Sequence, residues 1–114
     1  MRLGFVSLGF KIIIMIKHIV FWKLKEDAFG NDKQTNALQI KEKLEALRGE
    51  IEGLLHIEVG IDFSKSAMSH DVALYTEFAT KEALNFYQEH PKHKALLGFI
   101  TECRTERVVV DYEI

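Results

Sequence analysis

The sequence is poor in the residues that build disulfide frameworks, metal sites and nucleic-acid-binding surfaces. Its 114 residues include a single cysteine, Cys103, so no internal disulfide can form, and no CxxC or Cys/His ligand spacing is present. The formal net charge is only −2, with acidic and basic residues interspersed, so the chain has no field that attracts nucleic acid. A lone cysteine suits a reducing compartment, and we predict a cytoplasmic location.

Several motifs of enzyme chemistry are also absent. No GxGxxG, P-loop, GxSxG or HExxH pattern occurs, which leaves nucleotide, phosphate and protease chemistry without support. No apolar run reaches the roughly 20 residues that a helix needs to cross a membrane. The sequence therefore predicts no cofactor, no nucleic-acid partner and no membrane partner.

The first 14 residues have a composition of their own. They are largely apolar with Arg2 near the start, but Lys11 interrupts the run and no small-x-small cleavage site of a secretory signal follows. Met15 stands where a regular strand pattern begins. We interpret residues 1–14 as an extension upstream of the natural start, and residues 15–114 as one domain. The open alternative is an extra strand or an arm at the edge of a dimer.

Hydrophobic periodicity over the rest of the chain predicts strands and helices in alternation. Apolar residues alternate at period two in the strand segments and recur at spacings of three and four in the helical ones. Gly49 or Gly53 is the predicted stop of the first helix, Thr80 the N-cap of the second, and Pro91 the start of the third. The predicted elements are strand 16–24, helix 32–48, strand 55–63, strand 71–78, helix 80–89, a helix from Pro91, and strand 107–112.

Strand 55–63 alternates regularly along its whole length. One strongly apolar face is predicted for Leu55, Ile57, Val59, Ile61 and Phe63. The intervening residues, such as Glu58 and Asp62, are polar or small. This pattern is typical of a strand with one buried face.

The order βαββαβ with short connections predicts an α+β, ferredoxin-like domain, in which a four-stranded antiparallel sheet carries its helices on one face. Strand 16–24 has large apolar residues on both faces, since Val20 and Trp22 alternate with Ile19 and Phe21. A sheet face with Ile19 and Phe21 at its centre is too apolar to face water. The sequence therefore predicts a homodimer whose two sheets stack as a dimeric α+β barrel.

A cluster of chemically active side chains marks the junction of the last two helices. The seven residues from Tyr87 to His93 hold the only proline and two of the five histidines. Pro91 disfavours helical geometry at His90 and suits the first turn of a new helix. The distant partner of this cluster is His18, which shares a strand face with Val20 and Trp22.

Two interpretations of His18 stay open from the residues alone. It is either a neutral core histidine that joins the turn to the sheet through a hydrogen bond, or a general base. A third possibility is a metal site with His90 and His93, which are three positions apart. No carboxylate or thiolate is placed to complete such a site, so no metal is predicted.

Four segments in order resemble the stress-responsive dimeric α/β-barrel (Dabb) family over about residues 15–113. They are Lys17–Leu24, His70–Leu74, the pattern Tyr87-x-x-His90-Pro91-x-His93, and Val109–Tyr112. The resemblance implies a ferredoxin-like protomer that pairs into a barrel, and most members have no assigned reaction. One branch, the plant olivetolic acid cyclase, is an aldol-type polyketide cyclase. Its acid–base residues correspond in type to His18, Tyr87 and His93 here.

The predicted function follows from this resemblance together with the residues. We expect a homodimeric stress-responsive α/β-barrel protein that binds a small apolar or aromatic ligand between sheet and helices. The candidate ligand-binding residues are His18, Trp22, Tyr87, His90 and His93. The main alternative is an acid–base enzyme of the polyketide cyclase or lyase type, with His18, Tyr87 and His93 as catalytic residues. A cofactor-free monooxygenase is a further alternative that rests on analogy of fold.

Overall fold

The computed structural model describes residues 14–114. The predicted extension, residues 1–14, thus lies outside the described residues except for Ile14. The described elements follow one another as βαββαβ, with an additional two-stranded hairpin before the first helix. Their bounds are β1 Ile16–Leu24, β2 Asp27–Ala28, β3 Asn31–Asp32, α1 Lys33–Glu45, β4 Leu54–Ile61, β5 Val72–Phe78, α2 Lys81–Glu89, α3 Pro91–Cys103 and β6 Arg104–Glu113.

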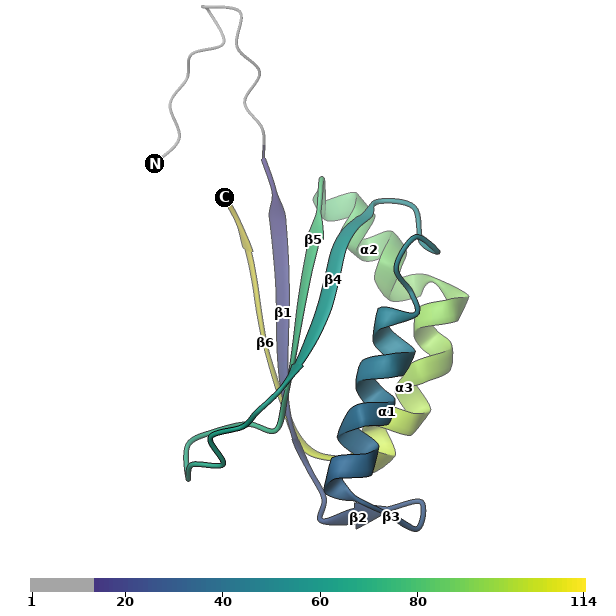
Figure 1. Ribbon diagram of the computed structural model, residues 1–114. Coiled ribbons are helices and arrows are strands. Elements are labelled where there is room, and N and C mark those ends of the chain that lie inside the picture. The colour runs from purple at the N-terminus through teal and green to yellow at the C-terminus, as the bar shows by residue number, and fades with distance from the viewer. Residues whose placement is uncertain (1–13) are drawn as a thin grey trace, which may run out of the picture.

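The four long strands form one antiparallel sheet in the order β4-β5-β1-β6. All three helices lie on the same face of this sheet (Figure 1). The predicted ferredoxin-like α+β fold is therefore confirmed. No helix within residues 14–114 is long and apolar enough to cross a membrane.

The core lies between the helices and one face of the sheet. On β1 every second residue is buried, from Ile16 through His18, Val20 and Trp22 to Leu24, as the alternation predicts. Buried side chains of α1 cover this face, including Ile40 and Leu44. Because burial of one such aliphatic side chain stabilises a fold by about 1.5–3 kcal/mol, this face holds the helices in place.

Local capping chemistry sets the helix junctions. The Thr80 hydroxyl accepts a hydrogen bond from the backbone N–H of Ala83 at 3.0 Å, which confirms it as the N-cap of α2. His90 then ends α2 and caps α3, because its backbone is extended and its Nδ1 accepts from the N–H of Lys92 at 3.1 Å. Pro91 is the first residue of α3, as predicted.

The first helix ends earlier than residue 48. The N–H groups of Leu47 and Arg48 bond to carbonyls only three residues back, so the chain tightens into turns after Glu45. Gly49 and Gly53 follow in the left-handed region, with φ of 76° and 89°. Apolar residues continue at helical spacing past Glu45, so the sequence pattern predicts a later end of the helix than the structure has.

The predicted apolar face of strand 55–63 is wrong at both ends. Leu54, not Leu55, pairs with Phe78, and the register shifts before His56, so Leu55 is the extra residue of a bulge and is exposed. The strand ends at Ile61, which leaves Phe63 in the following loop with 93% of its surface exposed. Because of the bulge, Leu54 and not Leu55 lies on the core side of the strand.

The last strand begins at Arg104, three residues before the predicted start at Arg107. Its first residues are polar and show no alternation, so the sequence gives no strand signal there. The structure nevertheless pairs Arg104 with Leu24, because β1 extends far enough to receive it. This earlier start brings α3 directly into β6.

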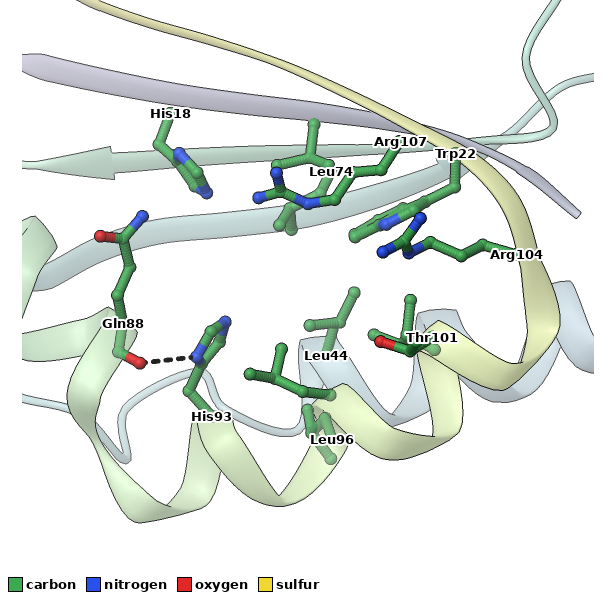
Figure 2. Close-up of a pocket in the computed structure, with 13 residues that line it drawn as sticks. His18, Trp22, Leu44, Leu74, Gln88, His93, Leu96, Thr101, Arg104 and Arg107 are labelled. Atoms are coloured by element: carbon green, nitrogen blue, oxygen red, sulfur yellow. Dashed lines mark hydrogen bonds between the residues drawn. The ribbon is translucent and has the colours of Figure 1, made fainter.

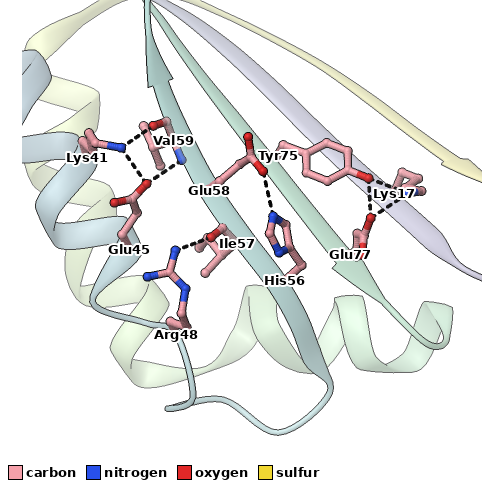
Figure 3. A network of polar contacts seen from close by, with 10 residues as sticks. All are labelled: Lys17, Lys41, Glu45, Arg48, His56, Ile57, Glu58, Val59, Tyr75 and Glu77. Atoms are coloured by element: carbon pink, nitrogen blue, oxygen red, sulfur yellow. Dashed lines mark hydrogen bonds and ion pairs between the residues drawn. The ribbon is translucent and has the colours of Figure 1, made fainter.

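Side chains from α1 and the turn after it cover the free edge of β4 (Figure 3). Lys41 donates to the carbonyl of Val59 at 2.7 Å, and the Glu45 carboxylate accepts from the N–H of the same residue at 2.9 Å. Arg48 donates to the carbonyl of Ile57 at 2.6 Å. These bonds occupy backbone groups that would otherwise be open to an added strand.

No helix of the described residues lies on the opposite face of the sheet. Ile19 and Phe21 lie at its centre and are half-buried by their neighbours, and the adjoining residues Val108 and Val110 of β6 are 42% and 53% exposed. At one end, Lys17 forms an ion pair with Glu77 at 2.7 Å beside the hydroxyl of Tyr75 (Figure 3). This outer face is thus apolar at the centre and polar toward one end.

Candidate functional site

A cavity of about 390 Å³ lies between the sheet and α3. Figure 2 shows side chains from the sheet and from α3 that point toward each other across it. Its apolar lining consists of Val20, Leu44, Leu74, Leu96, Leu97 and Ile100, together with the ring of Trp22. Its polar lining consists of His18, Gln88, His93, Thr101, Arg104 and Arg107.

His18 is a buried histidine whose ring is oriented by a carboxylate. Its Nδ1 lies 2.5 Å from an oxygen of Asp111, the residue directly opposite on β6. Because a carboxylate only accepts hydrogen bonds, Nδ1 carries the proton. In the neutral ring the lone pair then lies on Nε2, and Figure 2 shows the ring directed into the cavity.

His93 reaches the cavity from the first turn of α3. Its Nδ1 donates to the backbone carbonyl of Gln88 at 3.1 Å, so the lone pair of the neutral ring again lies on Nε2. Burial lowers the pKa of His93, and the nearby charges of His18, Arg107 and His90 lower it further against the effect of the Gln88 bond. His93 is therefore a neutral base at neutral pH.

Tyr87 does not line the cavity. It is completely buried, with its ring centroid 4.5 Å from that of His93 and 6.3 Å from that of His18. Its hydroxyl has no hydrogen-bond partner within the described residues, and burial raises its pKa. The structure thus brings the three predicted catalytic residues together, with Tyr87 behind the two histidines.

Of the two remaining predicted ligand-binding residues, one lines the cavity and the other does not. Trp22 lines the cavity, and its buried Nε1 has no acceptor within residues 14–114. His90 does not line the cavity, because its ring caps α3 and lies edge-on to Phe86 at 5.6 Å.

The polar residues that β6 contributes to the site were not predicted from the sequence. Arg107 and Asp111 share a face of that strand by simple alternation. Nothing in the sequence shows that this face is the cavity side, because that depends on the pairing of Asp111 with His18 and of Arg107 with Trp22. The register of an edge strand is a tertiary property.

The described residues support neither a metal site nor a cysteine nucleophile. Within residues 14–114 no group of three or more His, Cys, Asp or Glu side chains is arranged to hold a metal ion. Cys103 is a buried free cysteine, and burial raises the pKa of its thiol. A thiol in that state is a core residue rather than an activated nucleophile.

The fold agrees with what comparisons with known proteins found. An uncharacterized protein of Streptomyces coelicolor is 35% identical over 99 residues, which cover 87% of this chain and 99% of that protein. A dimeric protein of unknown function with a ferredoxin-like fold from Bacteroides fragilis is 36% identical, with a TM-score of 0.78, and the match covers 88% of this chain and 96% of that chain.

A hydroxynitrile lyase from Passiflora edulis has the same fold, with a TM-score of 0.72 and 20% identity over 88% of this chain and 93% of that chain. At this identity the likeness concerns the fold alone. Further solved structures with this fold are also described as dimeric.

The family assignment rests on most of the chain. The family model of the Stress responsive A/B Barrel Domain, abbreviated Dabb, matches residues 16–114, from the first residue of β1 to the C-terminus. The match includes every residue that lines the cavity. The resemblance that the sequence motifs indicate is confirmed, and the chain belongs to the Dabb family.

Proposed function

We propose that this protein is a homodimer that binds a small apolar or aromatic ligand in the cavity between the sheet and α3. The observation that carries the proposal is the cavity itself. Its volume of about 390 Å³ lies within the range of small-molecule sites, roughly 300–1,000 Å³. Such sites combine a mainly apolar wall with a few convergent polar groups, as His18 and His93 are here.

The outer sheet face supports the dimeric part of the proposal. Ile19, Phe21, Val108 and Val110 form an apolar strip across β1 and β6 that no element within residues 14–114 covers. Several solved structures with this fold are described as dimeric. Two sheets stacked through this strip would form an interface of the obligate type, which commonly buries more than about 2,000 Å².

Fluorescence of the single tryptophan gives a direct test of ligand binding, because Trp22 is the only tryptophan and lines the cavity. We expect small apolar phenols and alcohols such as 4-butylphenol to change this fluorescence in a saturable way. Leu96→Phe should fill the cavity and weaken binding at least about tenfold, which is about 1.4 kcal/mol. Leu38→Phe on the exposed side of α1 is the matched control. Binding that is equally tight in both variants would contradict the proposal.

An acid–base enzyme of the polyketide cyclase or lyase type is the second candidate. The His18–Asp111 pair favours it, since a carboxylate that orients an imidazole is a common arrangement for a general base. Two Nε2 lone pairs in one cavity suit abstraction of a proton next to a carbonyl and reprotonation of the enolate. In this scheme His18 and His93 touch the substrate, and Tyr87 is a positioning residue.

Turnover assays separate the two candidates. If the protein is an enzyme, His18→Ala and His93→Ala should each lower turnover of polyketide-like thioesters or cyanohydrins by about 10²–10⁴-fold while the dimer persists. Tyr87→Phe, which removes only the unpartnered hydroxyl, should lower it far less. If the protein only binds, no substrate turns over, and the histidine variants chiefly lose stability, by roughly 1–3 kcal/mol.

A further inference from the structure

Two arginines reach into the cavity without a charged partner among residues 14–114. Arg104 is the first residue of β6, and Arg107 lies opposite Trp22 on the same strand. Figure 2 shows both guanidinium groups directed toward the cavity. Among residues 14–114 neither guanidinium has an ion pair or a hydrogen bond. Arginine side chains that converge on a pocket in this way are typical of anion recognition.

The described residues give this part of the cavity many hydrogen-bond donors and no charged acceptor. Among the described residues, no aspartate or glutamate lines the cavity. Asp111 lies nearby, but its carboxylate is already bonded to His18. The indole Nε1 of Trp22, in the same wall, also lacks an acceptor within the described residues. A ligand with an anionic, acceptor-rich group would complement these donors.

A purely structural role explains only one of the two arginines. Arg104 is the C-cap residue of α3, where a positive charge stabilises the helix dipole. Arg107 lies three residues further along, in the strand, and has no such role. It is an exposed side chain of an edge strand that nevertheless turns toward the cavity.

We propose that the ligand is an apolar or aromatic carboxylic acid, and that Arg104 and Arg107 bind its carboxylate. This inference rests on the proposed function of the same cavity. The apolar body of the ligand would lie against Val20, Leu44 and Leu96. The end of the ligand opposite the carboxylate would lie between the two histidines. Figure 2 places these histidines at the end of the cavity away from Arg104.

A carboxylate suits this place better than a phosphate does. Phosphate sites in proteins commonly use the backbone N–H groups and the positive dipole of a helix N-terminus. Arg104 instead lies at the C-terminal end of α3, where the partial charge of the helix is negative. That end disfavours a dianion more than a monoanion. A planar guanidinium also matches a carboxylate in a bidentate arrangement.

The test compares two probes that share an alkyl chain and differ in the end group, octanoate and octanol. Each is titrated into the full-length protein and followed by Trp22 fluorescence and by calorimetry. We expect octanoate to bind at least about tenfold more tightly than octanol, with a preference that weakens as salt is added. Arg104→Gln and Arg107→Gln should each reduce the ratio of octanoate affinity to octanol affinity, and the double variant should bring that ratio close to one.

A matched control removes one positive charge from α3, outside the cavity. Lys94→Gln lies on the exposed side of α3 and should leave the octanoate preference intact. Equal affinity for the two probes, or a preference that survives in the double arginine variant, would overturn the carboxylate proposal and leave the apolar site standing. Tighter binding of octyl phosphate than of octanoate would overturn it as well. If neither octanoate nor octanol binds, the carboxylate proposal and the proposed ligand-binding function both fail.

Discussion

At the scale of single residues, the chemistry of the cavity depends on contacts between positions far apart in the chain. The two residues of the His18–Asp111 pair are 93 positions apart, and the bond fixes which ring nitrogen of His18 carries the lone pair. His93 acquires the same tautomer from a carbonyl only five residues away. Two different hydrogen bonds at Nδ1 therefore leave both Nε2 atoms unprotonated in the neutral rings, facing one cavity.

Burial of His93 makes stability depend on pH. Its pKa is lowered from the ordinary value of 6.5, so below that pH the unfolded chain binds a proton that the folded chain does not bind. The contribution of His93 to the free energy of unfolding is therefore complete above about pH 6.5 and is lost as the pH falls toward the folded-state pKa. Urea unfolding at about pH 7.5 and pH 5.5 should show a smaller loss at the lower pH for His93→Gln than for the unmodified chain.

An NMR titration of the His93 ring supplies the control for that measurement. The ring protons should titrate with a pKa below 6.5 in the folded protein. A ring pKa above 6.5, or an identical pH-dependent loss of stability in the two proteins, would contradict the assignment of a buried neutral base.

At the scale of elements, the α2–α3 junction positions the site. His90 ends one helix and caps the next through its side chain, so it orients His93 without entering the cavity. We expect His90→Ala to cost about 0.5–2 kcal/mol of unfolding free energy, the usual cost of a lost N-cap, and to leave ligand affinity unchanged. Chemical unfolding and Trp22 fluorescence titration measure the two effects.

Thr80→Ala is the matched variant for this prediction, because it removes the N-cap of α2 at a site away from the cavity. The two alanine variants should lose similar stability. Loss of ligand affinity in His90→Ala alone, with stability retained, would instead assign His90 to ligand binding.

The same scale shows what the sequence can and cannot predict about the fold. β1 is predicted to the residue, because its alternation is unbroken from Ile16 to Leu24. β4 is predicted with a wrong face at Leu55, because a bulge changes the register without changing the apolar pattern. Arg104 gives no strand signal, because pairing with β1 and not local alternation makes it a strand residue.

For the candidate site, too, the sequence predicts some residues and not others. Alternation and Pro91 place His18, Trp22 and His93 on the cavity side, since each depends only on a local period or a helix start. Arg107 and Asp111 could not be placed from the sequence, because their partners depend on how the last strand pairs with the first.

At the scale of the whole molecule, the uncovered sheet face has the strongest consequence. Phe21 lies at the centre of the apolar strip, so Phe21→Asp should give monomers or insoluble protein, because a charge would be buried between two sheets. Sedimentation velocity measures the outcome. Leu38→Asp on the outer side of α1 is the control and should remain dimeric. A folded Phe21→Asp dimer would refute the assignment of this face to the interface.

We also propose that the domain folds from Met15 onward. Met15 and Ile114 exchange two backbone hydrogen bonds, at 3.2 Å and 2.9 Å, so the pairing of β1 with β6 extends to this position. A chain that begins at Met15 should dimerise and melt like the full chain. A fall of about 4–8 °C in melting temperature, which corresponds to about 1 kcal/mol for a domain of this size, would show that residues 1–14 contribute to stability.

The location of a bound ligand tests the central claim most directly. The measurement is a crystal structure of the protein after soaking with a compound that changes Trp22 fluorescence. The predicted result is ligand density between the sheet and α3, in contact with His18, Trp22 and His93. Ligand density on the outer face of the sheet, beside Ile19 and Phe21, with the cavity empty, would contradict the account.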